Sequence, residues 1–489
     1  MIISLGILSA TLLLALLLSV RGARSTGGTT SLEQWSVGNR GFGTVLVFML
    51  LAGEIYTTFT FLGGSGWAYG RGAPAFYIIG YGAVAYIMSY WLLPAIWTRA
   101  TTWRVLSQSE YFARAYNSPA LGNLVALVSI ASLMPYLVLQ LKGLGIIVAE
   151  SSYGAISATA AIWIGTTATV VYVVLSGVKG SAMTAALKDA LVLITVVGLG
   201  IVLPYTLHGG IGPMFARIAA ERPGFLTLPD VGMSPSWFAS TVLVTVFGFY
   251  MWPHTFGSVF TARDASVFRR NAVLMPLYQL VLLFVFFIGF AALLSVPGLE
   301  GADADLALLR VTRAQFGPWI VGLVGAAGML TALVPGSLIL MSIATTLARI
   351  VRPRRDGDPP DSATWARVLV PVLAGVALLF TFRGGTTLVT LLLMAYSMVT
   401  QLFPPLLASL MPAARITASG AIAGILAGEA AVAANTIGGL SMPALLPQWP
   451  HAITDINTGF LALLLNVCTM LIVSRLTPPR TRPRTPRVG

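Results

Sequence analysis

Charged side chains are scarce in this chain of 489 residues. Asp, Glu, Lys and Arg together make up 9% of it, whereas hydrophobic residues make up 56%, and the mean hydropathy is +0.85. A soluble domain of this length needs a much more polar surface. The composition therefore excludes a soluble protein and predicts an all-α polytopic membrane protein.

Residues that carry enzyme chemistry are also sparse. Cys468 is the single cysteine, which excludes an internal disulfide bond. The sequence shows no metal-ligand cluster, no phosphate-binding loop and no nucleophile motif. These observations argue against an enzyme, and they predict no firm metal site.

Long apolar runs, by contrast, are abundant. A helix needs about 20 predominantly apolar residues to cross a bilayer, and runs of that kind recur along the whole chain. We predict thirteen transmembrane helices, at residues 2–20, 43–66, 73–97, 121–150, 155–175, 181–206, 237–262, 272–296, 317–350, 366–382, 387–411, 415–437 and 456–476.

The net charge of +13 could suggest a nucleic-acid-binding protein, but topology explains it better. With the N-terminus outside, 21 of the 29 Lys and Arg residues fall in cytoplasmic segments and 6 in outer segments, as the positive-inside rule requires. Lys142 and Lys188 lie inside spans. We therefore predict a multi-pass plasma-membrane protein in contact with lipid, with a cytoplasmic C-terminus and no nucleic-acid partner.

Glycine or proline interrupts two of the predicted spans. Residues 50–70 read LLAGEIYTTFTFLGGSGWAYG, and residues 246–260 read VFGFYMWPHTFGSVF. Interrupted helices at matching positions of two repeats mark the binding site of many secondary transporters. The offset of five spans predicts five-helix repeats at 43–206 and 237–411. A first helix and loop (1–42) precede them, and two helices (412–476) and a basic tail (477–489) follow.

Several motifs together resemble the sodium:solute symporter family. They are WSVGNRGFG (35–43), FLGGSGWAYGRG (61–72), SQSEYFARAYNSPALG (107–122), SGVKGSAMTAALKD (176–189) and TQLFPPLLASL (400–410). The resemblance implies a LeuT-type fold with inverted five-helix repeats and helices broken at the midplane. It also implies an ion-coupled symporter that works by alternating access, with Na+ or H+ as coupling ion and no other cofactor.

Other segments are similar to the monocarboxylate permease branch of that family. They include PYLVLQLKGLGI (135–146), YMWPHTFGSVF (250–260) and TALVPGSLILMSIA (331–344). This similarity implies that the solute is a short monocarboxylate such as lactate, pyruvate or an acetate-like acid. No obligatory protein partner is implied.

The resemblance also places an ion site. The family holds one sodium ion between the broken second span and the ninth span, which here implies the carbonyl groups of Gly53 and Tyr56 and the hydroxyl of Thr331. The cage is poor in hydroxyl groups, because the family's paired hydroxyl residues fall on Leu330–Thr331 or Val334–Pro335. Ser337 and Ser342 are weaker substitutes.

Lys188 and Asp189 stand inside an otherwise apolar run. Charges at membrane depth usually face a bundle interior or an aqueous path, although a lysine near a helix end can also extend back to the interface. The family's Thr-Asp pair falls on Thr184–Ala185, one turn before Lys188. We therefore favour an ammonium in place of the cation and proton coupling over sodium coupling, with Glu54 and Asp189 as partners.

Polar and aromatic residues around the two breaks are candidates for the solute site. They are Thr57, Thr60, Tyr136, Gln140, Lys142, Trp252 and His254. Lys142 could be the countercharge of a carboxylate, but it could equally pair with Glu150 or reach the outer surface. His254 could relay a proton or merely bond to carbonyl groups freed by the break.

Two other functions stay open at this stage. One is a sodium-coupled symporter of a neutral amino acid or another small solute. The other is a membrane sensor built on a transporter scaffold, because a fold does not fix a function. A sensor would be expected to carry a soluble signalling domain, and the last predicted span is followed only by a short basic tail.

Overall fold

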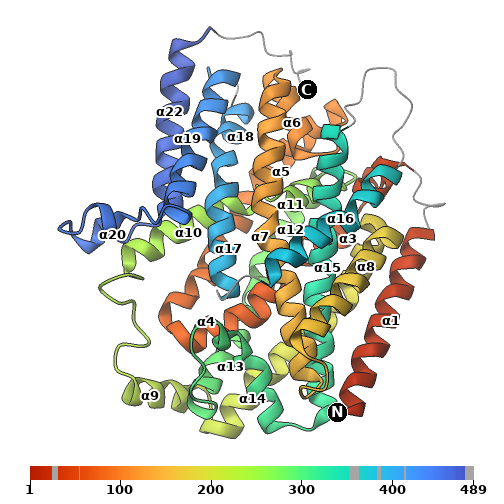
Figure 1. Ribbon diagram of the computed structural model, residues 1–489, viewed down its shortest axis with the longest axis vertical. Helices are drawn as coiled ribbons and strands as arrows, with labels where there is room; N and C mark the ends of the chain where they lie inside the picture. Colours follow the sequence, from red (N-terminus) through yellow and green to blue (C-terminus); the bar gives the residue numbers. More distant parts are fainter. Residues whose placement is uncertain (25–30, 54–55, 352–362, 383–386, 412–414, 479–489) are drawn as a thin grey trace.

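A computed structural model describes residues 1–24, 31–53, 56–351, 363–382, 387–411 and 415–478. Within these ranges the regular secondary structure is helical, as predicted (Figure 1). The start of α1 (Ile2–Arg24) and the end of α22 (Thr458–Leu476) lie at opposite ends of the molecule. An odd number of membrane crossings would produce this arrangement.

Eleven helical segments of the described chain are long and apolar enough to cross a membrane. Besides α1 and α22 they comprise α5 (Tyr77–Trp103), α7 (Pro119–Ser151), both parts of α8 (Ala158–His208), α12 (Ser266–Gln279) with α13 (Leu282–Ser295), α15 (Pro318–Val351), α16 (Thr364–Thr381), α17 (Leu388–Val399) with α18 (Phe403–Leu410), and α19 (Ala418–Thr436). Each coincides with one of the thirteen predicted spans. The two remaining predicted spans are the interrupted ones.

The first interrupted span consists of α3 (Thr44–Gly53), a π-helical turn η2 (Phe59–Gly63) and α4 (Gly64–Arg71). Hydroxyl groups of the IYTTFT segment bond to the backbone at the interruption. The Thr60 hydroxyl accepts from the Thr57 amide at 3.0 Å, and the Thr57 hydroxyl accepts from the Phe59 amide at 3.2 Å. Backbone groups inside a bilayer need such partners, so these threonines help to make the break tolerable.

The second interrupted span consists of α10 (Pro235–Phe249) and α11 (Pro253–Val259). Pro253 has no amide hydrogen, which prevents the helix from continuing through it. The freed carbonyl of Met251 accepts a hydrogen bond of 2.8 Å from Nε2 of Gln108. Gln108 begins α6 (Gln108–Tyr116), so a short helix remote in sequence stabilises this break.

The two interrupted spans meet at one end. The Phe42 amide donates to the Thr261 carbonyl at 2.9 Å, and the Arg263 amide donates to the Phe42 carbonyl at 3.0 Å. This parallel bridge links the start of the first interrupted span to the end of the second. The two breaks are thereby held in one structural unit.

The shorter elements connect these helices. They are α2 (Leu32–Val37), η1 (Gly38–Arg40), η3 (Ala73–Phe76), α9 (Ile211–Glu221), η4 (Gly301–Leu306), α14 (Ala307–Gln315), η5 (Thr400–Leu402), α20 (Met442–Leu445) and α21 (His451–Thr454). Helix α8 contains the predicted spans 155–175 and 181–206. The chain turns between them at Gly177, where φ is +62°. A side chain at Gly177 would also press against Trp35.

Helix α15 forms the centre of the bundle. In its most apolar stretch 94% of the residues are buried, against 22% in α1. It packs against α7, α8 and α1, whereas α19 and α22 pair at the far edge (Figure 1). The helix predicted to supply hydroxyl ligands is therefore the innermost one.

We predict that Gly289→Ala destabilises the bundle. Gly289 lets α13 approach α4 so closely that an added Cβ would overlap the Ser65 carbonyl oxygen and lie 2.9 Å from Cβ of Ala68. Overpacking of this kind costs about 1–3 kcal/mol, which thermal unfolding in detergent would measure. Gly198→Ala in α8 is the control, because its Cβ would meet open space. Equal stability of both variants would contradict this view of the α4–α13 contact.

Candidate ion and solute site

Lys188 reaches the break of the first interrupted span. Its ammonium Nζ donates to the Gly53 carbonyl at 2.8 Å and to the Tyr56 carbonyl at 3.1 Å. The Lys188 side chain is fully buried, and Asp189 Oδ1 lies 3.0 Å from the same nitrogen. Lys188 is thus placed at the two carbonyl groups that the sequence analysis proposed as cation ligands.

Helix geometry explains why a cation sits there. The last carbonyl groups of a helix lack partners within it and carry the negative end of the helix dipole. Gly53 ends α3, and its carbonyl is one of these groups. The ammonium therefore both satisfies buried acceptors and meets a favourable field.

Asp189 gives the ammonium a counter-charge. Its side chain is 13% exposed, and the Tyr278 hydroxyl of α12 lies beside the carboxylate. The Tyr56 ring packs edge-on against the Tyr278 ring, with centroids 5.1 Å apart. The pair is therefore enclosed by the end of α3, by Tyr56 in the break that follows it, and by α12. Glu54, the other predicted partner, lies outside the described residues.

Thr331 is buried in α15, and its hydroxyl donates to the Gly328 carbonyl at 2.6 Å within the same helix. The Ser337 hydroxyl likewise donates to Val334 at 2.6 Å and lies 3.0 Å from Ser181 Oγ. The proposed carbonyl ligands of a sodium ion, by contrast, are bonded to Lys188.

Gln140 of α7 contacts the same break. Its Oε1 accepts from the Thr58 hydroxyl at 2.6 Å and from the Thr58 amide at 3.4 Å. Among the described residues its Nε2 has no hydrogen-bond partner, although the side chain is only 1% exposed. A buried amide donor without a partner costs free energy, so Gln140 places an unused donor at the break. Thr58 was not predicted, and only its place in the run of hydroxyl residues indicates it.

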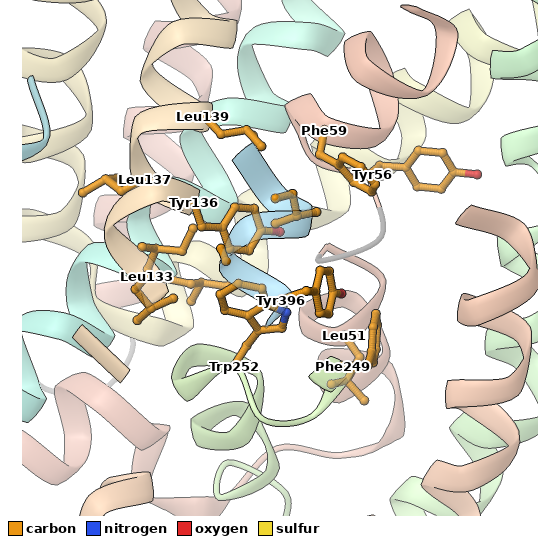
Figure 2. Packing of buried hydrophobic residues seen from close by; sticks show 14 of the residues in the cluster. Leu51, Tyr56, Phe59, Leu133, Tyr136, Leu137, Leu139, Phe249, Trp252 and Tyr396 are labelled. Atoms are coloured by element: carbon orange, nitrogen blue, oxygen red, sulfur yellow. The ribbon is translucent and has the colours of Figure 1, made fainter. Parts of the chain in front are cut away.

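Aromatic rings from three helices form the second part of the site. Tyr136 of α7 lies 4.9 Å from Trp252 and 5.6 Å from His254, measured between ring centroids. Trp252 lies 5.0 Å from Tyr396 of α17. Figure 2 shows Tyr136, Trp252 and Tyr396 gathered together. The sequence predicted three of these four residues and missed Tyr396, which stands alone in an ordinary apolar span.

A small cavity lies between α2, α6, α8, α11 and α15. Its polar lining includes His254, Gln108, Ser258, Ser342, Thr345 and Thr346. His254 therefore borders the aromatic cluster and the cavity at once. Gln108, Ser258 and Thr345 were not predicted as site residues, because nothing local in the sequence shows that packing brings their three helices to one cavity.

Lys142 lies apart from this geometry. The charges that act on it are those of Asp305 and Asp303, on the segment η4. Glu150, its alternative partner in the sequence analysis, pairs with Arg310 at 3.6 Å and Arg313 at 3.4 Å. Within the described residues, no group of three or more His, Cys, Asp or Glu side chains could hold a metal ion.

Two interrupted helices with a buried polar site at their breaks are the arrangement of the LeuT-type fold. A Na+-coupled sialic acid symporter has the same fold, with a TM-score of 0.78 at 17% identity over 98% of this chain and 99% of its own.

The family model of the sodium:solute symporter family matches residues 35–428. The uncharacterized symporter YhjB of Bacillus subtilis is 56% identical over 96% of both chains. A monocarboxylate transport permease protein of Rhizobium johnstonii is 26% identical over 92% of this chain and 91% of its own. The chain belongs to the sodium:solute symporter family, and its family and fold are those of transporters rather than enzymes.

We predict that Thr331→Val leaves the ion dependence of transport unchanged. The hydroxyl bonds within α15, so its loss should cost about 1 kcal/mol of stability and no coupling. Uptake rates with and without Na+, together with thermal unfolding, would measure both effects. Ser337→Ala is a matched control, since it removes the same kind of bond in the same helix. A selective loss of Na+-dependent uptake in Thr331→Val would show instead that Thr331 binds the ion.

Proposed function

We propose that the protein is a proton-coupled symporter that imports a short monocarboxylate across the plasma membrane by alternating access. The observation that carries this proposal is the Lys188 ammonium on the Gly53 and Tyr56 carbonyl oxygens. The family resemblance assigns these oxygens to a sodium ion. A lysine that can gain and lose a proton there would supply a cation without binding one.

Protonation of Lys188 would control the first break. As an ammonium it makes charge-assisted hydrogen bonds to two carbonyl groups and an ion pair with Asp189, and such bonds are about twice as strong as neutral ones. A neutral amine would hold α3 less tightly against α8. Loss of the proton would therefore favour movement of the interrupted helix relative to the rest of the bundle.

The chemistry of the break supports a carboxylate solute. The Nε2 of Gln140 is a buried donor at the break, and a carboxylate oxygen is a strong acceptor. Trp252, Tyr136 and Tyr396 provide apolar walls suited to a small carbon skeleton. The relative from Rhizobium johnstonii, named a monocarboxylate transport permease protein, supports the same solute class.

The orientation belongs to this proposal. The opposite positions of the two chain ends agree with an odd number of crossings, and the distribution of Lys and Arg favours an outer N-terminus and a cytoplasmic C-terminus. In that orientation the cavity beside His254 lies toward the cytoplasm. Solute released past His254 would leave through it.

The test is uptake of labelled lactate and pyruvate into proteoliposomes, with a proton gradient and a sodium gradient imposed separately. We expect accumulation with the proton gradient alone. Accumulation that needs sodium would replace this proposal by a sodium-coupled symporter. Absence of uptake of these acids under either gradient, with neutral amino acids accumulated instead, would refute the monocarboxylate assignment.

Lys188→Ala should abolish this gradient-driven accumulation while the protein still inserts into the membrane. Because alanine leaves two carbonyl groups without the ammonium, Lys188→Gln is the matched variant: its amide can donate to them but cannot titrate. We expect Lys188→Gln to retain solute exchange across the membrane at equal pH and to lose concentrative uptake. Normal accumulation by either variant would remove Lys188 from the coupling mechanism.

Gln140→Glu should weaken solute binding. The exchange replaces the buried donor by an acceptor of almost the same shape, so a carboxylate solute would face a like charge or an unpaired oxygen. We expect the KM for uptake to rise at least about tenfold, equivalent to about 1.4 kcal/mol, with normal insertion. Thr58→Ser, which retains the hydroxyl that binds Gln140, serves as the control. An unchanged KM in Gln140→Glu would exclude contact between Gln140 and the solute.

A further inference from the structure

A buried carboxylate stands where η4 closes over the first interrupted span. Asp305 is fully buried, although its neighbour Asp303 is exposed. The segment η4 packs against η2 and α4. The approach is close: a Cβ at Gly66 of α4 would lie 2.8 Å from the Ala304 carbonyl oxygen. The segment thus covers the break from the side of α14, which lies near the N-terminal end of the molecule (Figure 1).

One oxygen of Asp305 joins η4 to α17. Its Oδ2 accepts from the backbone amide of Leu388 at 2.9 Å, and Leu388 is the first residue of α17. A carboxylate is favourable there, because the first amide groups of a helix lack partners and carry the positive end of the dipole. The bond fixes η4 to a helix that contributes Tyr396 to the aromatic cluster.

The other oxygen of Asp305 can accept a proton. Within the described residues, Oδ1 is buried and has no hydrogen-bond partner. A carboxylate with one bonded and one unbonded oxygen in a dry site is costly as an anion, and a proton on Oδ1 would relieve that cost. The geometry therefore offers a place for a proton at the contact between η4 and α17.

We propose that Asp305 is a second proton-binding site of the transporter, located in its outer gate. A proton on the buried carboxyl removes the cost of the unpaired anion, while Oδ2 still accepts from Leu388, so protonation holds η4 on the start of α17 and keeps the solute site closed on this side. When the carboxyl is ionised, the closed contact carries that cost and the site opens more readily. The assignment of this side to the exterior, and of the proton to the transport cycle, rests on the function proposed above.

The charges around Asp305 can be named. On η4 itself there is Asp303, and on α7 there is Lys142, whose positive charge opposes protonation of Asp305. On α14, Arg310 and Arg313 pair with Glu150.

The remaining neighbours, η2 and the first turns of α17, contribute no ionisable side chain, while α4 contributes Tyr69 and Arg71 near its end. Burial is the largest effect and raises the pKa of Asp305 to about 6, against the Leu388 hydrogen bond and the Lys142 charge.

The direction of the effect suits proton-driven import. A carboxyl whose pKa is about 6 is ionised above that pH and protonated below it. Because burial raises this pKa, the closed contact binds the proton more tightly than an open, hydrated one would. The contact between η4 and α17 should therefore tighten as the outer pH falls below about 6 and loosen at neutral outer pH. A proton taken up from outside would thus favour closure of the gate behind a bound solute.

The experiment measures access to a cysteine behind the gate, in the full-length chain reconstituted in proteoliposomes. Cys468→Ser removes the native thiol, and Val389→Cys places a thiol at a fully buried position of α17 beside Gly63. A membrane-impermeant thiol reagent is added outside at pH 5 and at pH 7.5. The labelling rate at Val389→Cys is divided by the labelling rate at Glu300→Cys, an exposed reference site just before η4. The division cancels the intrinsic pH dependence of thiol labelling.

We expect the normalised rate to fall about tenfold from pH 7.5 to pH 5. Asp305→Asn, which keeps an oxygen for the Leu388 amide but cannot ionise, should label at the slow rate at both pH values, and Asp305→Glu should restore the pH dependence. Asp303→Asn removes the same charge from the exposed neighbour and should behave like the parent.

A normalised rate independent of pH in the parent, or an unchanged pH dependence in Asp305→Asn, would overturn the proposal. Labelling of the Glu300→Cys reference only from inside the vesicles, in protein of known orientation, would also overturn it, together with the orientation proposed above. Because no solute or transport is involved, a pH-independent result would leave the proposed symport untouched. Conversely, failure of solute uptake would not affect this measurement.

Discussion

The structure depends on partners for the backbone groups that two helix breaks expose inside the membrane. A bilayer offers no water to satisfy them, so each must bond within the protein. Lys188 serves the carbonyl groups of Gly53 and Tyr56, while Thr57 and Thr60 serve the amide groups that follow. At the second break Gln108 serves Met251. The breaks persist because other helices supply these bonds.

This dependence connects stability with transport. Hydrogen bonds from neutral side chains to a break do not depend on a proton. Hydrogen bonds from an ammonium become weaker when the ammonium loses its proton. Asp189 adds an ion pair to the same nitrogen. Lys188 therefore stabilises the break in the first interrupted span. In the proposed mechanism, loss of its proton also weakens the contact that holds this break.

The two sides of the bundle are built differently. On the side of α6, a small cavity reaches His254 and several other polar side chains. On the side of α14, η4 lies on α4 at close approach and is joined to α17 through Asp305. The structure thus combines a closed face and a hollowed face, which is the asymmetry that alternating access requires. A buried charge at the closed face gives it a means to respond to pH.

The sequence alone determined the class, the eleven long spans and the places of the two breaks, because these follow from apolar run length and from the local effects of glycine and proline. It also identified Lys188 as a candidate site residue, since a charge inside an apolar run is costly unless it has a partner in the protein. Tertiary structure alone decided which groups meet. The shared Thr58–Gln140 contact, the position of Tyr396 beside Trp252, and the bond from Leu388 to Asp305 all join distant segments. Which face of one helix meets which face of another is set by packing, and local periodicity does not encode it.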